Sequence, residues 1–253
     1  MTALNLGVSY PLAVLEGVGV AVAGGALGWV AGAWLHPWVG VAMAMVAAVN
    51  GLVSGIRRVY PWRSSRGWMA FVLDSTWASL PVATGLAAHV VALATKGEFL
   101  PAMSERQGHH VYRRGAAFKK GYALTLGNVI SGAAEVERPR RAQLIRDHEG
   151  VHVWQARWFG PFYLPLYGLW SAGGAAVGLL VWLRRGRREP VGHVVETCSY
   201  YTNPFEWWAY SRDAYWPPHG KVADVGWKKP VVRSFAEVRA EVSAADVVAD
   251  EPT

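Results

Sequence analysis

Four long apolar stretches dominate the pattern of hydrophobic and polar positions along the chain. Each is near or above the roughly 20 residues that an α-helix needs to cross a bilayer. They run over residues 14–35, 38–56, 68–94 and 161–183. The first two are continuous, and Gly24, Gly28 and Gly32 fall four apart on one face of the first, a spacing that lets two helices approach closely. The pattern therefore predicts a pair of membrane-spanning helices packed against each other.

The other two stretches hold residues that a simple lipid-facing helix tolerates poorly. The third carries Asp74 and Pro81. The fourth is interrupted at Pro165, Gly168, Gly173 and Gly174. We expect both stretches to be kinked, re-entrant or only partly embedded, with their polar backbone groups covered by protein.

A polar region separates the third and fourth stretches. Within it, residues 110–130 form short runs rich in Val, Tyr, Phe, Thr and Leu that glycines interrupt, which predicts a small hairpin or meander. Residues 141–158 then show helical apolar spacing that ends at Gly160. The tail from residue 219 is polar, and we expect one short helix after Ser234 and a disordered acidic end.

These elements predict a mainly α-helical integral membrane protein, with multi-pass helices and a small β-containing region. We expect a transmembrane anchor region over residues 1–94. A second region over residues 95–218, interrupted by the apolar segment 161–183, holds most of the polar residues that can carry chemistry. A polar C-terminal tail covers residues 219–253.

Composition supports a membrane protein. Only 17% of the 253 residues are charged, against roughly 25% in a soluble domain. The net charge of +7 would suggest nucleic acid as a partner of a soluble chain, but here arginines cluster beside apolar segments, where basic residues mark the cytoplasmic side. We therefore expect the lipid bilayer, and no nucleic acid, as partner. Because Cys198 is the single cysteine, a metal site must use His and carboxylate ligands.

An H-E-x-x-H motif lies in the helix predicted from residue 141, at His148-Glu149-Gly150-Val151-His152. Residues i and i+4 share one helical face, so both imidazoles can bind one Zn²⁺ ion. Glu149, turned about 100° from His148, can approach a metal-bound water. The alternative is that both histidines are hydrogen-bonded surface or interface groups.

A catalytic zinc site usually has three protein ligands and an open fourth position, so a third ligand is needed. Glu206 is the leading candidate, because it follows Pro204 at the start of a helix-like stretch among aromatic residues, where an unpaired carboxylate would be costly. The alternative for Glu206 is a capping or salt-bridging role. The rival ligands are His109, His110 and Asp147.

The motif, followed 54 residues after His152 by Glu206-Trp207-Trp208-Ala209, resembles the membrane-embedded gluzincin metallopeptidases, the HtpX-like and CAAX-prenyl-protease-like group. The resemblance covers roughly residues 141–213. It implies a zincin-like catalytic region in which His148, His152 and Glu206 bind zinc and Glu149 is the general base. Tyr210 stands where that family has an Asp, a position that normally helps to orient a ligand histidine.

The implied function is that of a membrane-integral, zinc-dependent metallopeptidase. It would hydrolyse peptide bonds of peptide or membrane-protein substrates with a zinc-activated water and Glu149 as base. The oxyanion also needs a donor, and the sequence leaves that choice open. The candidates are Tyr210 and His110, with Tyr200, Tyr201 and His109 beside them.

Three further features could belong to the site. The strand-like run over residues 122–126 could offer an edge to an extended peptide. Gln155, one turn beyond His152, either lines the cleft or is solvated. Cys198 could approach the metal, but a small buried thiol is the simpler interpretation.

Topology poses a difficulty for the third ligand. If the stretches 68–94 and 161–183 each cross the membrane once, the H-E-x-x-H motif and Glu206 lie on opposite sides of a hydrocarbon layer about 30 Å thick. Basic residues near both regions favour the cytoplasmic side. We therefore expect a multi-pass cell-membrane protein whose catalytic region faces the cytoplasm.

Two hypotheses belong to other classes of protein. One is a non-catalytic membrane scaffold with a structural metal site or no metal, and the other is a subunit of a homo- or hetero-oligomeric membrane complex. Coordination distinguishes the scaffold from the enzyme, because a structural zinc site is closed by four protein ligands whereas a catalytic site keeps one position open.

Overall fold

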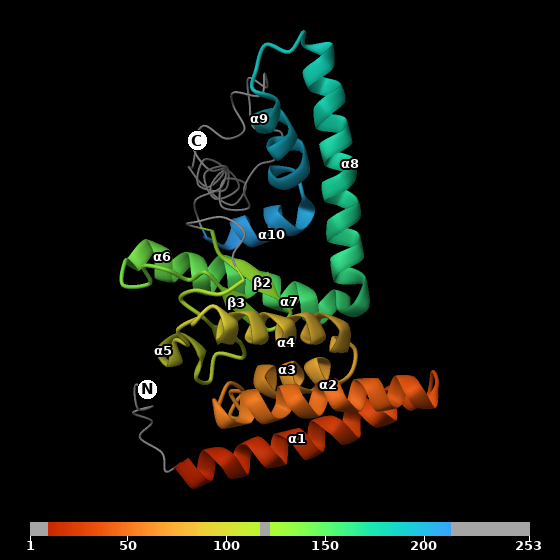
Figure 1. Cartoon of the computed structure of the whole chain (residues 1–253), viewed down its shortest axis with the longest axis vertical. Helices are drawn as coiled ribbons and strands as arrows, with labels where there is room; N and C mark the ends of the chain where they lie inside the picture. The colour runs from red at the N-terminus through yellow and green to blue at the C-terminus, as the bar shows by residue number, and fades with distance from the viewer. Residues whose placement is uncertain (1–9, 117–121, 214–253) are drawn as a thin grey trace, which may run out of the picture. The chain divides into compact units, whose positions relative to one another are not determined.

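The computed structural model describes residues 10–116 and 122–213 (Figure 1). This part of the chain is mostly helical and contains a small sheet. The contacts divide the chain into two compact units, Met1–Tyr163 and Leu164–Thr253. The helix expected after Ser234 and the acidic end lie outside the described residues.

The first unit begins with a helical hairpin of α1 (Tyr10–Ala33) and α2 (Pro37–Ile56). Its glycines are needed for close packing: a Cβ added at Gly28 would lie 2.7 Å from the carbonyl oxygen of Met43, and one at Gly32 would lie 2.8 Å from the Cα of Gly40. The prediction that the Gly24–Gly32 face packs against the next helix is therefore confirmed.

The third apolar stretch forms two helices, α3 (Ser65–Ser75) and α4 (Ser79–Ala94), which are bent by 89°. The expected kink is thus present. It does not lie at Pro81, which occupies the first turn of α4, where no intrahelical N–H bond is lost.

A three-stranded sheet follows, with β1 (His110–Val111), β2 (Leu124–Leu126) and β3 (Val129–Ser131) in the order β1-β3-β2. The antiparallel pair β2–β3 confirms the predicted hairpin, and Gly127, at φ +54, supplies its turn. The parallel pairing of β1 with β3 was not part of the expected meander. The short helix α5 (Pro101–Ser104) precedes β1.

The H-E-x-x-H motif lies in a run of short helices: α6 (Pro139–Gln143), the π-helix η1 (Leu144–Glu149), α7 (Gly150–Phe159) and the 3-10 turn η2 (Gly160–Phe162). Apolar residues from the sheet, from this run and from the segments beside the strands form one buried cluster, made up of Leu100, Val111, Ile130, Ala133, Ile145 and Val153. The sheet therefore supports the helix that carries the motif.

A buried ion pair attaches α7 to the bent helices. The guanidinium of Arg157 donates from Nε and Nη2 to the two carboxylate oxygens of Asp74, both at 2.8 Å, and Nη2 also donates to the carbonyl of Gly108. Tyr60 donates its hydroxyl to the same carboxylate at 3.0 Å. Asp74 is tolerated in an apolar helix because its charge is paired and hydrogen-bonded.

The second unit contains α8 (Tyr163–Arg184), α9 (Val191–Glu196), the π-helix η3 (Thr197–Tyr201) and α10 (Pro204–Asp213). Contrary to the expected interruption, α8 is one continuous helix. Its only proline, Pro165, lies in the first turn, and Gly174 and Gly178 lie against η3 and α9, which return along α8 (Figure 1). These two glycines permit close approach rather than breaking the helix.

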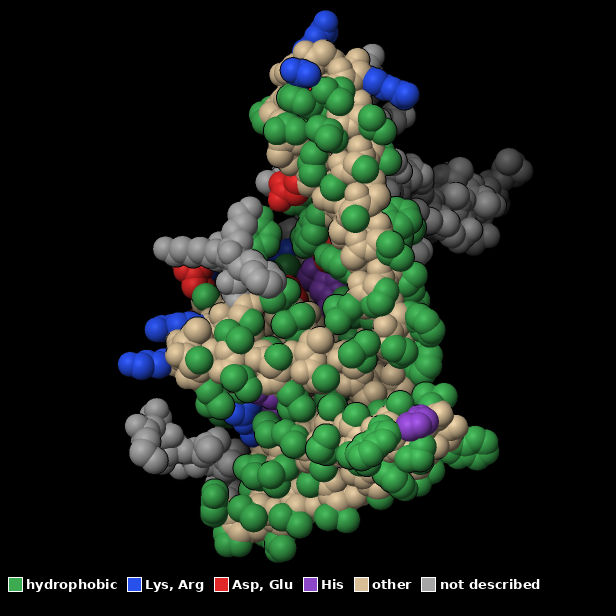
Figure 2. Space-filling model, turned by 45° about the vertical axis from the view of Figure 1, so that its right-hand side comes forward, with side chains coloured by type: hydrophobic (Ala, Val, Ile, Leu, Met, Phe, Trp, Pro, Cys, Tyr) green, Lys and Arg blue, Asp and Glu red, His purple; other side chains and the backbone are tan. Residues whose placement is uncertain are grey.

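Three helical stretches are long and apolar enough to cross a membrane: Tyr10–Ala33, Pro37–Ile56 and Pro139–Arg184, the last of which ends with α8. The bent pair α3–α4 would be a fourth span if it counts as one. Hydrophobic side chains cover much of the visible surface of α1, α2 and α8 (Figure 2). These features allow association with a membrane.

Candidate metal centre

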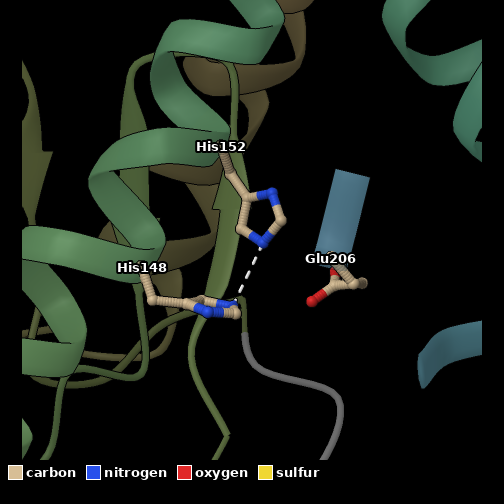
Figure 3. A group of neighbouring side chains, drawn as sticks. All are labelled: His148, His152 and Glu206. Atoms are coloured by element: carbon tan, nitrogen blue, oxygen red, sulfur yellow. Dashed lines mark hydrogen bonds between the residues drawn. The ribbon is translucent and has the colours of Figure 1, made fainter. Parts of the chain in front are cut away.

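The two histidines of the H-E-x-x-H motif face each other. His148 lies next to the last residue of the π-helix η1, and His152 lies one turn later in α7. The motif therefore spans a change of helix type, a feature that is frequent at functional sites. Their Nε2 atoms are 3.2 Å apart and both side chains are buried (Figure 3). Burial excludes two surface histidines, and hydrogen-bonded interface groups stay the alternative to metal ligands.

The separation of 3.2 Å fits two arrangements. One is a hydrogen bond in which one Nε2 donates to the other. The second is a shared metal ion, because two nitrogens bound to a tetrahedral Zn²⁺ lie about 3.3 Å apart. The donor atoms of this pair thus fit a zinc ion.

Gln155 lies beside His152. Its side chain is fully buried, and its Oε1 is 2.8 Å from Nδ1 of His152. The hydroxyl of Tyr163 lies 3.4 Å from the same nitrogen. When Nδ1 donates its proton to the amide oxygen, Nε2 carries the lone pair that a metal requires. Gln155 is therefore a buried partner of His152 and not a solvated residue.

Glu149 is held by the sheet. Its carboxylate is buried, and Oε2 accepts a hydrogen bond of 2.6 Å from the hydroxyl of Thr125 on β2. The strand order places β2 at an edge of the sheet. The candidate base therefore lies beside the strand edge that the sequence suggested for peptide binding.

Glu206 is positioned within the second unit by the start of α10. Asn203 precedes the helix, and its Oδ1 accepts a hydrogen bond of 3.0 Å from the backbone N–H of Phe205. The carboxylate of Glu206 is buried and accepts a hydrogen bond of 2.7 Å from the hydroxyl of Tyr167.

The capping alternative for Glu206 would require its carboxylate to accept the backbone N–H of Asn203. That N–H instead donates to the carbonyl of Tyr200 at 2.9 Å. Glu206 is thus not the reciprocal partner of a capping box, and the salt-bridging role stays an alternative.

His148 and His152 in the first unit and Glu206 in the second are buried residues of the types that could hold a metal ion. Two imidazoles and one carboxylate are the ligand set of one class of catalytic zinc site, which keeps its fourth position for water. The rival ligand Asp147 is only half-buried and does not belong to this group.

His110 belongs to a different cluster. It is fully buried, its Nε2 lies 2.9 Å from the hydroxyl of Ser54, and its ring packs edge-on against His89 with centroids 4.5 Å apart. Burial holds its pKa well below the usual value, so the ring is neutral. These contacts do not include His148 or His152, and His110 as an oxyanion donor stays a prediction.

The remaining candidates lie in two places. Burial, with the positive charges of Arg157 and Arg66, lowers the pKa of His109 to about 3. In the second unit, Tyr210 follows Glu206 by one turn of α10, and its hydroxyl is 3.4 Å from that of Tyr200.

Tyr201 completes the aromatic cluster of the second unit. Cys198 is buried there too, and burial raises the pKa of its thiol, as expected for a structural cysteine.

Three residues that contact the predicted site residues were not identified from the sequence: Thr125, Tyr163 and Tyr167. Thr125 lies in the predicted strand run, but nothing in that run distinguishes it. Tyr163 and Tyr167 are spaced i, i+4 at the start of an apolar helix. This spacing is the one feature of the sequence that could have identified them.

Comparison with protein-family models, with curated proteins and with solved structures found no match for this chain.

Proposed function

We propose that this protein is a membrane-embedded zinc metallopeptidase that cleaves extended peptides. The observation that carries the proposal is that one end of α8 contacts both halves of the ligand set. Tyr163, the first residue of α8, contacts His152. Tyr167 donates its hydroxyl to Glu206. Four residues of helix rise about 6 Å, which supports a common site for the three ligands.

This observation also bears on the topological difficulty. Because α9, η3 and α10 return along α8, the chain brings Glu206 back beside the first turns of that helix. Glu206 therefore lies near the start of the apolar segment 161–183. A single crossing of the membrane would instead have placed it beyond the far end of that segment. A third ligand after an apolar helix is therefore compatible with the motif before it.

In this proposal, His148, His152 and Glu206 hold the zinc ion. When bound, zinc supplies a Lewis acid that polarises the scissile carbonyl and lowers the pKa of water at the open position. Glu149 accepts the proton of the attacking water and passes it to the leaving amine. The hydroxyl of Thr125 holds Oε2 of Glu149, so Oε1 is the oxygen that takes the proton.

The edge strand β2 suggests how substrate is aligned. Its outer side has no strand partner among the described residues, and its residue Thr125 touches Glu149. A peptide that adds to this edge as a further strand would run past the base with its carbonyls in register. We therefore propose an extended peptide segment as the substrate class.

The test is zinc content and peptide hydrolysis of the purified full-length chain in detergent. We expect about one zinc per chain in the wild type and its loss in His148→Ala, His152→Ala and Glu206→Ala. Glu149→Gln should keep zinc but lower kcat by about 10²–10⁴-fold, the typical contribution of a general base.

His36→Asn is the matched control, because it removes an exposed imidazole and keeps a side chain that can cap α2. It should change neither readout. A wild-type protein without zinc, or a fully active Glu149→Gln variant, contradicts the proposal.

A further inference from the structure

The C-terminal end of α8 is closed by a specific turn. The backbone N–H of Arg187 donates to the carbonyl of Trp182 at 3.1 Å, and that of Gly186 donates to Leu183 at 3.0 Å. Gly186 has φ +69. This pair of hydrogen bonds around a glycine in the left-handed region is a Schellman motif, so the turn has a defined backbone.

Side chains hold the following residues against this turn. The indole N–H of Trp182 donates to the carbonyl of Glu189 at 2.8 Å. Arg185 pairs with the carboxylate of Glu189 at 3.3 Å. The guanidinium of Arg187 lies over the ring of Trp182, 5.3 Å from its centroid. Two of the four arginines are thus occupied in building the loop.

The other two arginines, Arg184 and Arg188, are exposed and make no hydrogen bond or ion pair with any described residue. They line a hollow together with Arg185, Gly186 and Glu189. We call this site the arginine hollow. Residues 184–189 carry four positive charges and one negative charge, a local net charge of +3. A helix C-terminus benefits from a cation by only about 0.3–1 kcal/mol, so capping alone does not account for this density of arginine.

An apolar surface borders the arginine hollow. Leu180 is 57% exposed, and Leu179 and Leu183 in the last turns of α8 are also exposed. Figure 2 shows basic side chains gathered at the end of α8, above a helix surface that is covered with hydrophobic side chains. A ligand that fits both features carries an anionic group next to a hydrocarbon chain.

We propose that the arginine hollow binds the phosphate of an anionic phospholipid, whose acyl chains lie along the last turns of α8. Guanidinium groups bind phosphate oxygens through paired N–H bonds, which the ammonium of lysine cannot form. Basic residues beside a membrane are also attracted to anionic lipids in general. Inorganic phosphate offers the same oxygens without the acyl chains, so the test separates the two sources. This site is independent of the metal centre.

The experiment measures lipid retention by the purified full-length chain with native mass spectrometry. Phosphatidylglycerol and phosphatidylcholine are added at equal concentration. We expect the wild type to retain phosphatidylglycerol preferentially. The double variant Arg184→Lys/Arg188→Lys keeps the net charge and should lower that retention by about tenfold, which corresponds to about 1.4 kcal/mol. Arg184→Gln/Arg188→Gln should lower it at least as much.

Arg114→Lys/Arg138→Lys is the matched control, because it makes two Arg-to-Lys changes at exposed sites of the first unit. It should retain lipid as the wild type does, and helical circular dichroism should be equal in all variants. Wild-type retention by the Arg184→Lys/Arg188→Lys variant overturns the proposal, because charge alone then explains the effect. Displacement of the lipid by millimolar inorganic phosphate would assign the hollow to a free anion and overturn the lipid as ligand.

Discussion

At His152 the two ring nitrogens face different partners. Nε2 points to His148, while Nδ1 lies against the amide oxygen of Gln155. A buried hydrogen bond on one nitrogen decides which tautomer the ring adopts and so which atom is left to bind a metal. Gln155 supplies this hydrogen-bond partner from within the helix that carries the motif.

Replacement of Gln155 therefore tests whether this contact matters to the metal. We expect Gln155→Leu to weaken zinc binding by about 10–100-fold, the usual cost of losing such a partner. Gln155→Glu keeps an acceptor and should retain binding. Competition with a chromophoric chelator measures the affinity. Gln143→Leu, on α6, is the control, and equal affinities of the Gln155→Leu variant and the wild type would contradict the role.

The buried His109 predicts a pH dependence of stability. Its pKa in the folded chain is about 3, below the value of about 6.5 in an unfolded chain. Between these values the unfolded state binds the proton and the folded state does not. The contribution of neutral His109 to the free energy of unfolding is therefore fully present above about pH 6.5. It falls as the pH drops, with a limiting slope of about 1.4 kcal/mol per pH unit.

His109→Asn should reduce the loss of thermal stability between pH 7 and pH 5, because it removes one group that titrates only in the unfolded state. The exposed-histidine variant His36→Asn should leave that loss unchanged. Melting curves at the two pH values, followed by circular dichroism, measure the difference. An identical loss in wild type and His109→Asn would show that this ring is not the source.

At the scale of elements, the ion pair of Arg157 with Asp74 ties the motif helix α7 to α3. Both side chains are at most 2% exposed, so removing one partner leaves a buried charge uncompensated. We expect Asp74→Asn to destabilise the fold by about 3–5 kcal/mol. A double change to apolar residues, Asp74→Leu/Arg157→Met, should recover much of this loss, because no unpaired charge remains.

The measurement is a double-mutant cycle from chemical denaturation in detergent, with Asp74→Leu and Arg157→Met as the single variants. A strong positive coupling is expected, since the two side chains share two hydrogen bonds. Additive losses would mean that the pair does not act as a unit. The exposed pair Arg138–Glu135 serves as a reference, because exposed ion pairs contribute about 0–1 kcal/mol.

At the scale of the whole molecule, the long apolar helices predict integration into a membrane. Three helical stretches pass the length and hydropathy requirement, and α8 exposes large apolar side chains such as Leu169, which is 71% exposed. A large exposed apolar surface of this kind is unfavourable in contact with water. We expect the expressed chain to stay in the membrane fraction after alkaline carbonate extraction and to be released only by detergent. Recovery in the carbonate supernatant would contradict membrane integration.

Local patterns accounted for much of the fold. Apolar length identified α1 and α2, glycine spacing identified the face on which they pack, and the Gly127 turn identified the β2–β3 hairpin. Helical spacing placed His148 and His152 on one face. These features depend on residues close in sequence, so their geometry follows from the period of a helix or strand. The sequence did not predict the continuity of α8. Pro165 does not break the helix because it lies in the first turn, and Gly174 and Gly178 allow η3 and α9 to pack closely against it.

The sequence by itself determined the residue types that can bind a metal, their spacing on one helix and the apolar lengths that can cross a bilayer. The tertiary structure alone decided that Asp74 pairs with Arg157, 83 residues away, that Gln155 is buried against His152 and that Tyr167 holds Glu206. The physical reason is that burial and hydrogen-bond partners depend on which distant segments meet. A periodic pattern specifies the face of a helix but not the group that will lie against it.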